Sequence, residues 1–334
     1  MILLITDNSP DYGADWLSHG LVELAGPGKV VDWPRKASLH WSVGEPQFDC
    51  CCSLDTARLS TDETAQYLRD GTFDLIVVPT LRGNVPQRLY FARDLFRRNA
   101  DRIVYYDAED NSRDSLPLFV DTVGFRPVAY FKRELPLGET WAQPLPFGYP
   151  AERAHPPSSA RPFVGTYDAF LWEWVGDRLR KRLANELRKL QNFGVFATSN
   201  SAERMSVTTN NQRLRLSRLA VSPAGHGYQT NRHLGIVAAG CCPIIEGPPW
   251  VEFPDQFIRG VDCLYFKDEV ECVDAVRDLI EQPEWALELA QAAQLKFLDH
   301  HTTKHRALTV WQSVHGTLNV KPEVDYGVAA SAVD

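Results

Sequence analysis

Residues 222–247 read SPAGHGYQTNRHLGIVAAGCCPIIEG, and this stretch decides the fold. Its pattern predicts the end of a strand, a loop with Gly225 and Gly227, a helix that opens near Tyr228 to Arg232, and a second apolar strand. A helix N-terminus presents unpaired N–H groups and the positive end of the helix dipole, so Arg232 in the first turn is electrostatically misplaced. A bound anion at the loop would explain this placement.

The composition describes an acidic globular chain of two-domain size. Its 334 residues are 44% hydrophobic and 11% aromatic, which is ample for two packed cores. The formal net charge of −8 argues against broad binding to nucleic acid or anionic membrane, although a local basic groove is compatible with an acidic average. No long apolar run predicts a membrane span, and the first residues, MILLITDNSPDYG, indicate a buried strand rather than a signal peptide.

The cysteines indicate a reducing compartment. They are odd in number, include adjacent members and form no C-x-x-C pair, so the simplest location is cytoplasmic. A metal or redox site at the triple CCC is the alternative, but adjacent side chains diverge, and ordinary packing is favoured. The seven residues are Cys50, Cys51, Cys52, Cys241, Cys242, Cys263 and Cys272.

Short apolar runs alternate with helix-period segments through the first half of the chain. Strands separated by helices predict right-handed crossovers and a mostly parallel sheet that is covered on both faces. The expected strands are 1–6, 29–33, 73–80, 102–110 and 126–135, and the expected helices are 14–26, 62–70 and 86–100, with one more short helix before the last strand.

The same alternation restarts after a proline-rich linker. The linker predicts a domain boundary near residues 145–162. The two halves therefore predict an α/β fold of two doubly wound, Rossmann-like domains that face each other across a cleft, followed by a loose tail. The expected ranges are 1–150, 160–315 and 316–334. The expected elements of the second half are strands 162–168, 193–199, 214–223, 242–247 and 261–266, a helix over 172–191, and a helical run from 268 to 315 that is interrupted at Pro283 and near 300–306.

The helix over 172–191 carries one apolar stripe at steps of three and four residues. We expect this stripe to lie in the core and the basic residues of the same helix to form a solvated face. The stripe consists of Trp172, Val175, Leu179, Leu183, Leu187 and Leu190.

The glycines do not match a dinucleotide site. A dehydrogenase needs G-x-G-x-x-G after a strand, but DNSPDYGADW follows the first strand. In the second half only GHG is present, preceded by a strand and followed by a helix that Thr230 and Asn231 can cap. Arg232 can reach back to a diphosphate at this loop. The small residues Gly235, Ala238, Ala239 and Gly240 are best explained by close packing of the helix on the sheet.

At this point the residues resemble a known family. The stretch SPAGHGYQTNRHLGIVAAGCCPII, the segment from FIRGVDCLYF to LAQAAQ and the run HTTKHR are similar to the C-terminal half of GT-B glycosyltransferases, closest to the CgeB-like group and the group 1 family. Weaker similarities, such as DAED before YFKREL and PLPFGYP, extend the resemblance over most of residues 1–310. One departure is Gly235, where the family has a glutamate that contacts the donor. Glu246 can substitute for it or be an exposed loop acid.

The resemblance implies a hexosyl- or pentosyltransferase that uses a nucleotide-diphospho-sugar, with a UDP-sugar as the expected donor. Transfer requires stabilisation of the charge on the departing diphosphate, which a helix N-terminus, loop N–H groups and an arginine can provide without a metal. No other cofactor is expected. The donor-binding candidates are Gly225, His226, Gly227, Tyr228, Thr230, Arg232 and Glu246.

Transfer also requires a base for the acceptor hydroxyl. Sites in α/β folds gather at the carboxyl ends of strands, so the base is expected in the first domain. We place Asp110 and Asp11 first, although an acid at a strand end is often only a helix cap. Lys132 and Arg133 add positive charge to the cleft or lie in solvent. The other candidates for the base are Asp107, His19, Asp7 and Glu109.

Three alternatives remain open. The DAE triplet and the pair His301 and His305 are weak metal patterns, and neither has the full context of a metal site. A non-catalytic nucleotide or sugar sensor of the same architecture is the competing function.

The acceptor is a saccharide, a protein or a hydroxymethylated DNA base of phage type. Among these acceptors, DNA is suggested by an arginine-rich segment of the first domain. The segment contains Arg82, Arg88, Arg93, Arg97 and Arg98.

Overall fold

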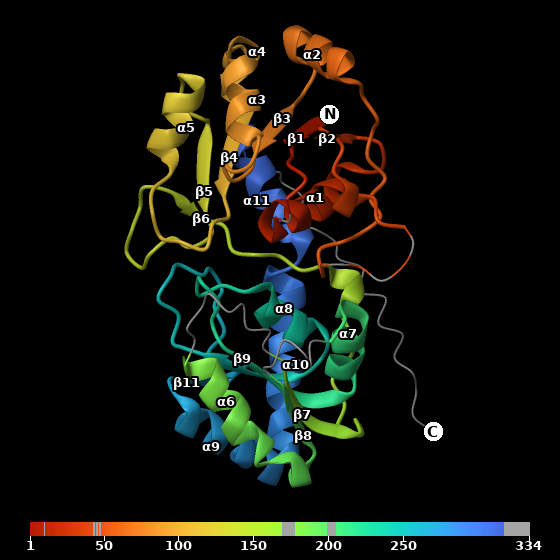
Figure 1. The fold of residues 1–334 in the computed structure, drawn as a ribbon, viewed down its shortest axis with the longest axis vertical. Helices are drawn as coiled ribbons and strands as arrows, with labels where there is room; N and C mark the ends of the chain where they lie inside the picture. The colour runs from red at the N-terminus through yellow and green to blue at the C-terminus, as the bar shows by residue number, and fades with distance from the viewer. Residues whose placement is uncertain are drawn as a thin grey trace.

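Each half of the chain forms one sheet of parallel strands, and the two units lie end to end along the long axis of the molecule (Figure 1). The computed structural model describes residues 1–9, 11–42, 44, 46, 48–168, 178–198 and 205–316. Residues 172–177 of the predicted helix, with Trp172 and Val175, and residues 317–334 of the predicted tail lie outside the described residues.

The first unit is a six-stranded sheet in the order β2-β1-β3-β4-β5-β6, and all its strand pairs are parallel. Alternate residues of β1 point to opposite faces, as a strand requires: Ile2 and Leu4 pack with α1 and α11, whereas Leu3 and Ile5 pack with α2 to α5. The strands are β1 Ile2–Ile5, β2 Val30–Trp33, β3 Leu75–Val78, β4 Ile103–Asp107, β5 Ala129–Lys132 and β6 Gln143–Pro144, and the helices are α1 Tyr12–Ala25, α2 Thr61–Asp70, α3 Val85–Phe91, α4 Arg93–Arg97 and α5 Leu116–Val123.

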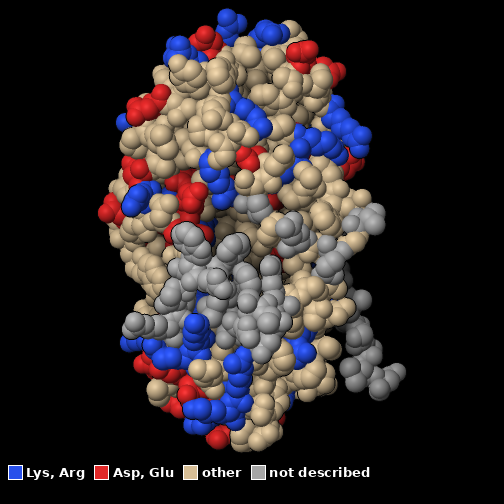
Figure 2. Space-filling model, viewed as in Figure 1, with Lys and Arg blue, Asp and Glu red and all other residues tan. Residues whose placement is uncertain are grey.

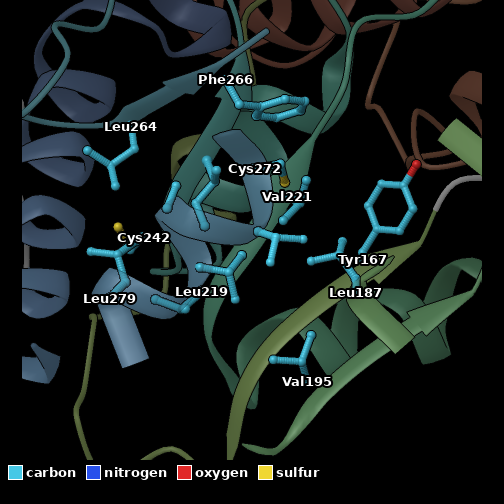
Figure 3. Packing of buried hydrophobic residues seen from close by; sticks show 14 of the residues in the cluster. Tyr167, Leu187, Val195, Leu219, Val221, Cys242, Leu264, Phe266, Cys272 and Leu279 are labelled. Atoms are coloured by element: carbon cyan, nitrogen blue, oxygen red, sulfur yellow. The ribbon is translucent and has the colours of Figure 1, made fainter. Parts of the chain in front are cut away.

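The second unit is a five-stranded parallel sheet in the order β11-β10-β9-β7-β8. Figure 3 shows one of its cores, in which side chains from β7 to β11 meet Leu187 of α6 and Cys272 and Leu279 of α9. The opposite face is covered by α7 and α8. The strands are β7 Phe163–Asp168, β8 Val195–Thr198, β9 Ser217–Ser222, β10 Cys242–Glu246 and β11 Leu264–Phe266, and the helices are α6 Arg178–Arg188, α7 Val207–Arg215, α8 Asn231–Ala238, α9 Glu269–Glu281, α10 Pro283–His300 and α11 Thr303–His315.

One predicted strand includes residues that are helical in the structure. The range 214–223 was expected to be extended throughout, but Leu214 and Arg215 end α7 and β9 begins at Ser217. The Ser206 hydroxyl accepts a hydrogen bond from the Thr209 N–H at the start of α7, which is an N-cap that the prediction missed. The predicted breaks in the last helical run are confirmed, because α10 begins at Pro283 and α11 at Thr303.

The last helix crosses back to the first unit. We expected residues 160–315 to form the second domain, but α11 packs along α1, and its Ala307 and Val310 lie in the core of the first sheet. Figure 1 shows α10 beside the second sheet and α11 beside the first. The units are therefore joined twice, by the linker before β7 and by the turn between α10 and α11.

Two expectations concern membranes and cysteines. No helix among the described residues has the length and apolarity to span a membrane. All seven cysteines are free, and only Cys52 is not fully buried. Burial raises the pKa of the Cys52 thiol to about 12, so the thiol stays protonated at neutral pH. The burial of these thiols agrees with the interpretation that the triple CCC packs in the core.

Candidate functional site

The loop between β9 and α8 lies at the carboxyl end of the second sheet, on the side that faces the first unit (Figure 1). β9 ends at Ser222, and α8 begins at Asn231 with Thr230 as its N-cap, as the sequence predicted. The loop closes on itself, because the Gly225 N–H donates to the Gly227 carbonyl at 2.8 Å. Parallel sheets place their sites at this edge.

The start of α8 leaves polar groups without partners. The Thr230 hydroxyl is buried, and no hydrogen-bond partner for it lies among the described residues. The Thr230 side chain does not cap the helix, and the described contacts give no acceptor for the backbone N–H groups of Thr230 and Asn231. A buried polar atom without a partner is costly, so this helix end is suited to an anionic ligand.

Two arginines flank the loop. Arg232 is half-buried and donates to the Pro223 carbonyl at 3.3 Å, which holds its guanidinium beside the loop. Arg180 of α6 is only 7% exposed and donates to the Ala224 carbonyl. The sequence prediction that the basic residues of this helix form a solvated face was wrong for Arg180. The apolar stripe alone did not show that Arg180 turns toward the loop.

Glu246 contacts the start of the same loop. It ends β10, and its carboxylate accepts a hydrogen bond from the Ala224 N–H at 2.9 Å. The register of β10 against β9 explains this position, since Ile245 pairs with Ser222 at the end of β9. Glu246 is therefore next to the loop, as its position at the strand end suggested.

His233 fixes the loop to the sheet. Its Nε2 contacts the Tyr228 carbonyl at 3.0 Å, and its Nδ1 contacts the Ser222 hydroxyl at 2.7 Å. A carbonyl only accepts, so Nε2 carries the proton and Nδ1 accepts from Ser222. Burial and the neighbouring Arg232 lower the pKa of His233 to about 3, so the ring is neutral at pH 7. His233 is thus a structural residue of the loop.

A carboxylate of the first unit occupies part of the expected phosphate cradle. Glu134, two residues after β5, accepts hydrogen bonds from the N–H groups of Tyr228 at 2.8 Å and Gln229 at 2.9 Å. A Cβ at Gly227 would collide with the Glu134 carboxyl group. The expectation that the Tyr228 N–H faces a diphosphate is therefore not met in this structure. Nothing in the local pattern around Glu134 indicated this contact.

Arg133 adds a second contact between the first unit and the same loop. Its guanidinium donates to the Gln229 carbonyl and to the Ala108 carbonyl, pairs with Asp110, and lies 4.4 Å from the centre of the Phe147 ring. Lys132 and Arg133 are 0% and 1% exposed, so the interpretation of these two residues as solvent-exposed was wrong.

The predicted catalytic acids lie in different surroundings at the carboxyl edge of the first sheet. Asp107 is 1% exposed and pairs with Lys132 at 2.8 Å. Asp11 caps α1 by accepting from the Ala14 N–H and pairs with Arg82 at 3.0 Å. Both of these carboxylates therefore have structural partners.

Asp110 is the most accessible of the predicted acids. Its side chain is 55% exposed and, through Arg133, adjoins the loop of the second unit. Figure 2 shows acidic and basic side chains next to one another on the part of the first unit that faces the second.

The other sequence candidates have structural contacts as well. His19 bridges the Thr303 hydroxyl at 3.1 Å and Glu152 at 2.8 Å, so it joins α1 to α11 and to the linker. Asp7 accepts from the Ser9 and Asn84 N–H groups, which lowers the pKa of its carboxyl despite partial burial.

The two metal patterns are also accounted for by protein contacts. His301 contacts the Asp255 carbonyl and Arg306, and His305 contacts the Thr302 hydroxyl at 2.7 Å. In the DAE triplet, Asp107 is held by Lys132. No group of three metal-ligating side chains occurs in the part of the chain that the structure describes.

Gly235 faces an aromatic ring at the position where the resemblance led us to expect a carboxylate. A Cβ at Gly235 would meet the ring and hydroxyl of Tyr149 at 3.6–3.7 Å. The Tyr149 hydroxyl donates to Asp49 at 2.9 Å, and Asp49 also pairs with Arg153. The place next to this turn of α8 is therefore filled by Tyr149 of the linker.

Comparisons with known proteins agree with this architecture. A family profile described as glycosyl transferase-like matches residues 174–312. No curated protein sequence gives a match. Among solved structures, Anabaena HepE in complex with UDP-glucose has a TM-score of 0.55 and 13% identity, and the alignment covers 95% of this chain and 99% of that chain.

Two further solved structures are similar over most of their length. A glycosyltransferase from Rickettsia africae has a TM-score of 0.57 and 8% identity over 94% of this chain and 98% of that chain. An alpha-glucosyltransferase in complex with UDP and a 13-mer DNA containing an HMU base has a TM-score of 0.57 and 9% identity over 94% and 99%. The expected fold of two facing Rossmann-like units is confirmed by these likenesses.

Proposed function

We propose that this chain, a glycosyltransferase of the GT-B fold, moves a sugar from a nucleotide-diphospho-sugar to an acceptor hydroxyl. The predicted activity class is confirmed by the family match, which covers most of the second unit. The donor nucleotide is proposed to be a UDP-sugar, because HepE is described in complexes with UDP and UDP-glucose.

The observation that carries the donor assignment is the unsatisfied start of α8. The buried Thr230 hydroxyl, the N–H group of Asn231 and the guanidinium of Arg232 lie together at one helix end. We place the diphosphate at this helix end, and not at the N–H groups of residues 226–228 that the sequence suggested. The helix dipole and the arginine would stabilise the negative charge that develops on the leaving diphosphate. These groups are why we propose a metal-independent transfer.

The proposed base is Asp110. Its carboxylate is exposed, and Arg133 connects it to the loop that would hold the donor. Asp11, Asp107 and His19 are less suitable because their side chains are only 8%, 2% and 15% exposed, whereas that of Asp110 is 55% exposed. A base must reach the acceptor hydroxyl, and accessibility therefore decides between these residues.

The acceptor and the compartment are proposed on separate grounds. A DNA acceptor is supported by the alpha-glucosyltransferase complexes with DNA and by exposed arginines on α4. A saccharide or a protein is the other acceptor class.

The free thiols support a reducing, cytoplasmic compartment.

Arg232→Ala tests the donor site. We expect nucleoside diphosphate release from a UDP-sugar to fall about 100-fold or more, because a charge partner of the leaving group is lost. Release is measured with a panel of UDP-sugars, with and without candidate acceptors. Arg277→Ala is the matched control, since Arg277 is 59% exposed on α9 and pairs with Asp274 of its own helix.

The result also separates the enzyme from a sensor. UDP-sugar binding without release under any acceptor condition would favour the non-catalytic sensor. Equal release by wild type and Arg232→Ala would show that the diphosphate binds elsewhere.

A further inference from the structure

We propose that, in the absence of a donor, the Glu134 carboxylate occupies the loop between β9 and α8 as an internal anion. Glu134 and Arg133 then hold the two units together, and this set of contacts is called the latch below. A donor must compete with the latch in order to bind. The latch residues are Glu134 and Arg133 on the first unit and Tyr228 and Gln229 on the second. The inference rests on the proposed donor site at the start of α8.

The latch is a buried, reciprocal set of hydrogen bonds. Glu134 accepts from two consecutive N–H groups, Arg133 donates to the Gln229 carbonyl, and the Gln229 side chain donates back to the Arg133 carbonyl at 2.9 Å. Glu134, Tyr228 and Gln229 are 1%, 2% and 4% exposed. Charge-assisted bonds in such a dry setting hold the loop against the first unit.

A second contact continues the junction further along the chain. The Glu252 N–H donates to the Leu135 carbonyl at 2.7 Å, and the Glu252 carboxylate accepts from the Gly138 N–H at 2.7 Å. This contact also joins the two units, but its carboxylate lies outside the loop. Glu252 is therefore a natural control for Glu134.

The latch and a bound diphosphate would place like charges side by side. Gln229 directly precedes Thr230, and consecutive Cα atoms are only about 3.8 Å apart. A diphosphate at Thr230 and Arg232 would thus lie close to the Glu134 carboxylate in a poorly screened site. Burial already raises the pKa of Glu134, which shows that its charge is held against a desolvation cost.

The latch lies between the two units, where transfer would take place. The sugar of the donor must meet the acceptor between the units, and Asp110, the proposed base, is itself paired with Arg133. Opening the contact at Gln229 would free the loop and leave Asp110 with its arginine on the first unit. Donor entry and release of the loop are therefore linked equilibria.

Hydrogen exchange of the free protein tests the latch without any ligand. In Glu134→Gln one of the two acceptor oxygens becomes an NH2 group, which cannot accept, so one of the two N–H groups loses its partner. Exchange of a peptide covering residues 226–231 should therefore accelerate about tenfold. Glu252→Gln should leave this peptide unchanged. Unchanged protection in Glu134→Gln would overturn the proposal. Glu134→Asp, which keeps the charge but shortens the reach, gives the same test if the first variant does not fold.

Binding of UDP tests the competition. We expect Glu134→Gln to bind UDP about tenfold more tightly than wild type, whereas Glu252→Gln binds like wild type. Titration calorimetry measures the affinities. Equal or weaker binding by Glu134→Gln would mean that Glu134 supports the donor site instead of competing with it. If UDP binds to neither protein, the proposed donor site fails, and the exchange experiment still decides whether Glu134 is a latch.

Discussion

Gly227, in the loop before α8, and Gly235, within α8, differ in what an added side chain would meet. Gly227 allows the Glu134 carboxylate to approach the loop, because any Cβ there would collide with it. At Gly235 a Cβ would only touch the Tyr149 ring at ordinary contact distance. An alanine is therefore expected to be tolerated at Gly235 and to disturb the loop at Gly227. The sequence pattern GHG suggested a phosphate loop, but the neighbour that requires Gly227 is a side chain of the protein.

His233 predicts a pH dependence of stability. Its pKa is about 3 in the folded protein and about 6.5 when unfolded, so the unfolded chain binds the proton more tightly. The stabilising contribution of the neutral ring is complete above about pH 6.5 and is lost as the pH falls. Between about pH 6.5 and pH 5 the loss should amount to about 2 kcal/mol of unfolding free energy.

His233→Gln provides the measurement. Urea unfolding at both pH values should show a smaller acid-dependent loss for the variant than for wild type, since glutamine does not titrate. His226→Gln is the control, because His226 is exposed on the same loop. Identical pH slopes for wild type and His233→Gln would show that His233 is not the titrating group.

The donor-site residues differ in how visible they are in the sequence. Arg232 and Glu246 could be found because they occupy recognisable places, the first turn of a helix and the end of a strand. Glu134 and Arg180 could not, since their contacts to the loop come from elements distant in the chain. Local patterns report on neighbours within a few residues, and the missing contacts are tertiary.

At the scale of elements, the placement of α11 was the least predictable feature. Its apolar residues Ala307 and Val310 would fit either sheet, so periodicity shows that a face is buried but not against which partner. The contact with α1 depends on Gly20, where a Cβ would collide with the Thr303 carbonyl. The two helices can approach closely only because this side chain is absent.

Gly20→Ala tests this packing. The added methyl group must displace backbone of α11, so the free energy of unfolding should fall by about 1–3 kcal/mol. Thermal or urea unfolding measures the change. Gly165→Ala is the control, because a Cβ at that buried strand position would meet its neighbours at 3.6 Å or more. Wild-type stability of Gly20→Ala would mean that α1 and α11 separate readily.

At the scale of the whole molecule, the net charge of −8 conceals an uneven distribution of arginines. Arg82 pairs with Asp11, and Arg88 donates to the Thr6 carbonyl at 2.7 Å, so these two are held by the first unit. The exposed members of the predicted segment, Arg93, Arg97 and Arg98, lie on or next to α4. The five arginines therefore do not act as one surface.

A salt-dependent gel shift tests whether the exposed arginines contact DNA. We expect retardation of a hydroxymethylated duplex at low salt, with a slope of log affinity against log salt of about −3 for three phosphate contacts. Simultaneous replacement of Arg93, Arg97 and Arg98 by alanine should reduce this slope to near zero. Arg277→Ala serves as control. Absence of any shift at low salt would remove DNA from the candidate acceptors.

The sequence by itself determined most of the strands and helices, the fold of two parallel α/β units and the likeness to glycosyltransferases, because apolar periodicity, turn residues and the pattern around Arg232 are local. Only the tertiary structure decided that Glu134 occupies the N–H groups of Tyr228 and Gln229, that Arg180 joins the loop, and that α11 returns to the first sheet. These contacts join residues far apart in the chain, and their energies depend on burial and geometry that no short pattern encodes.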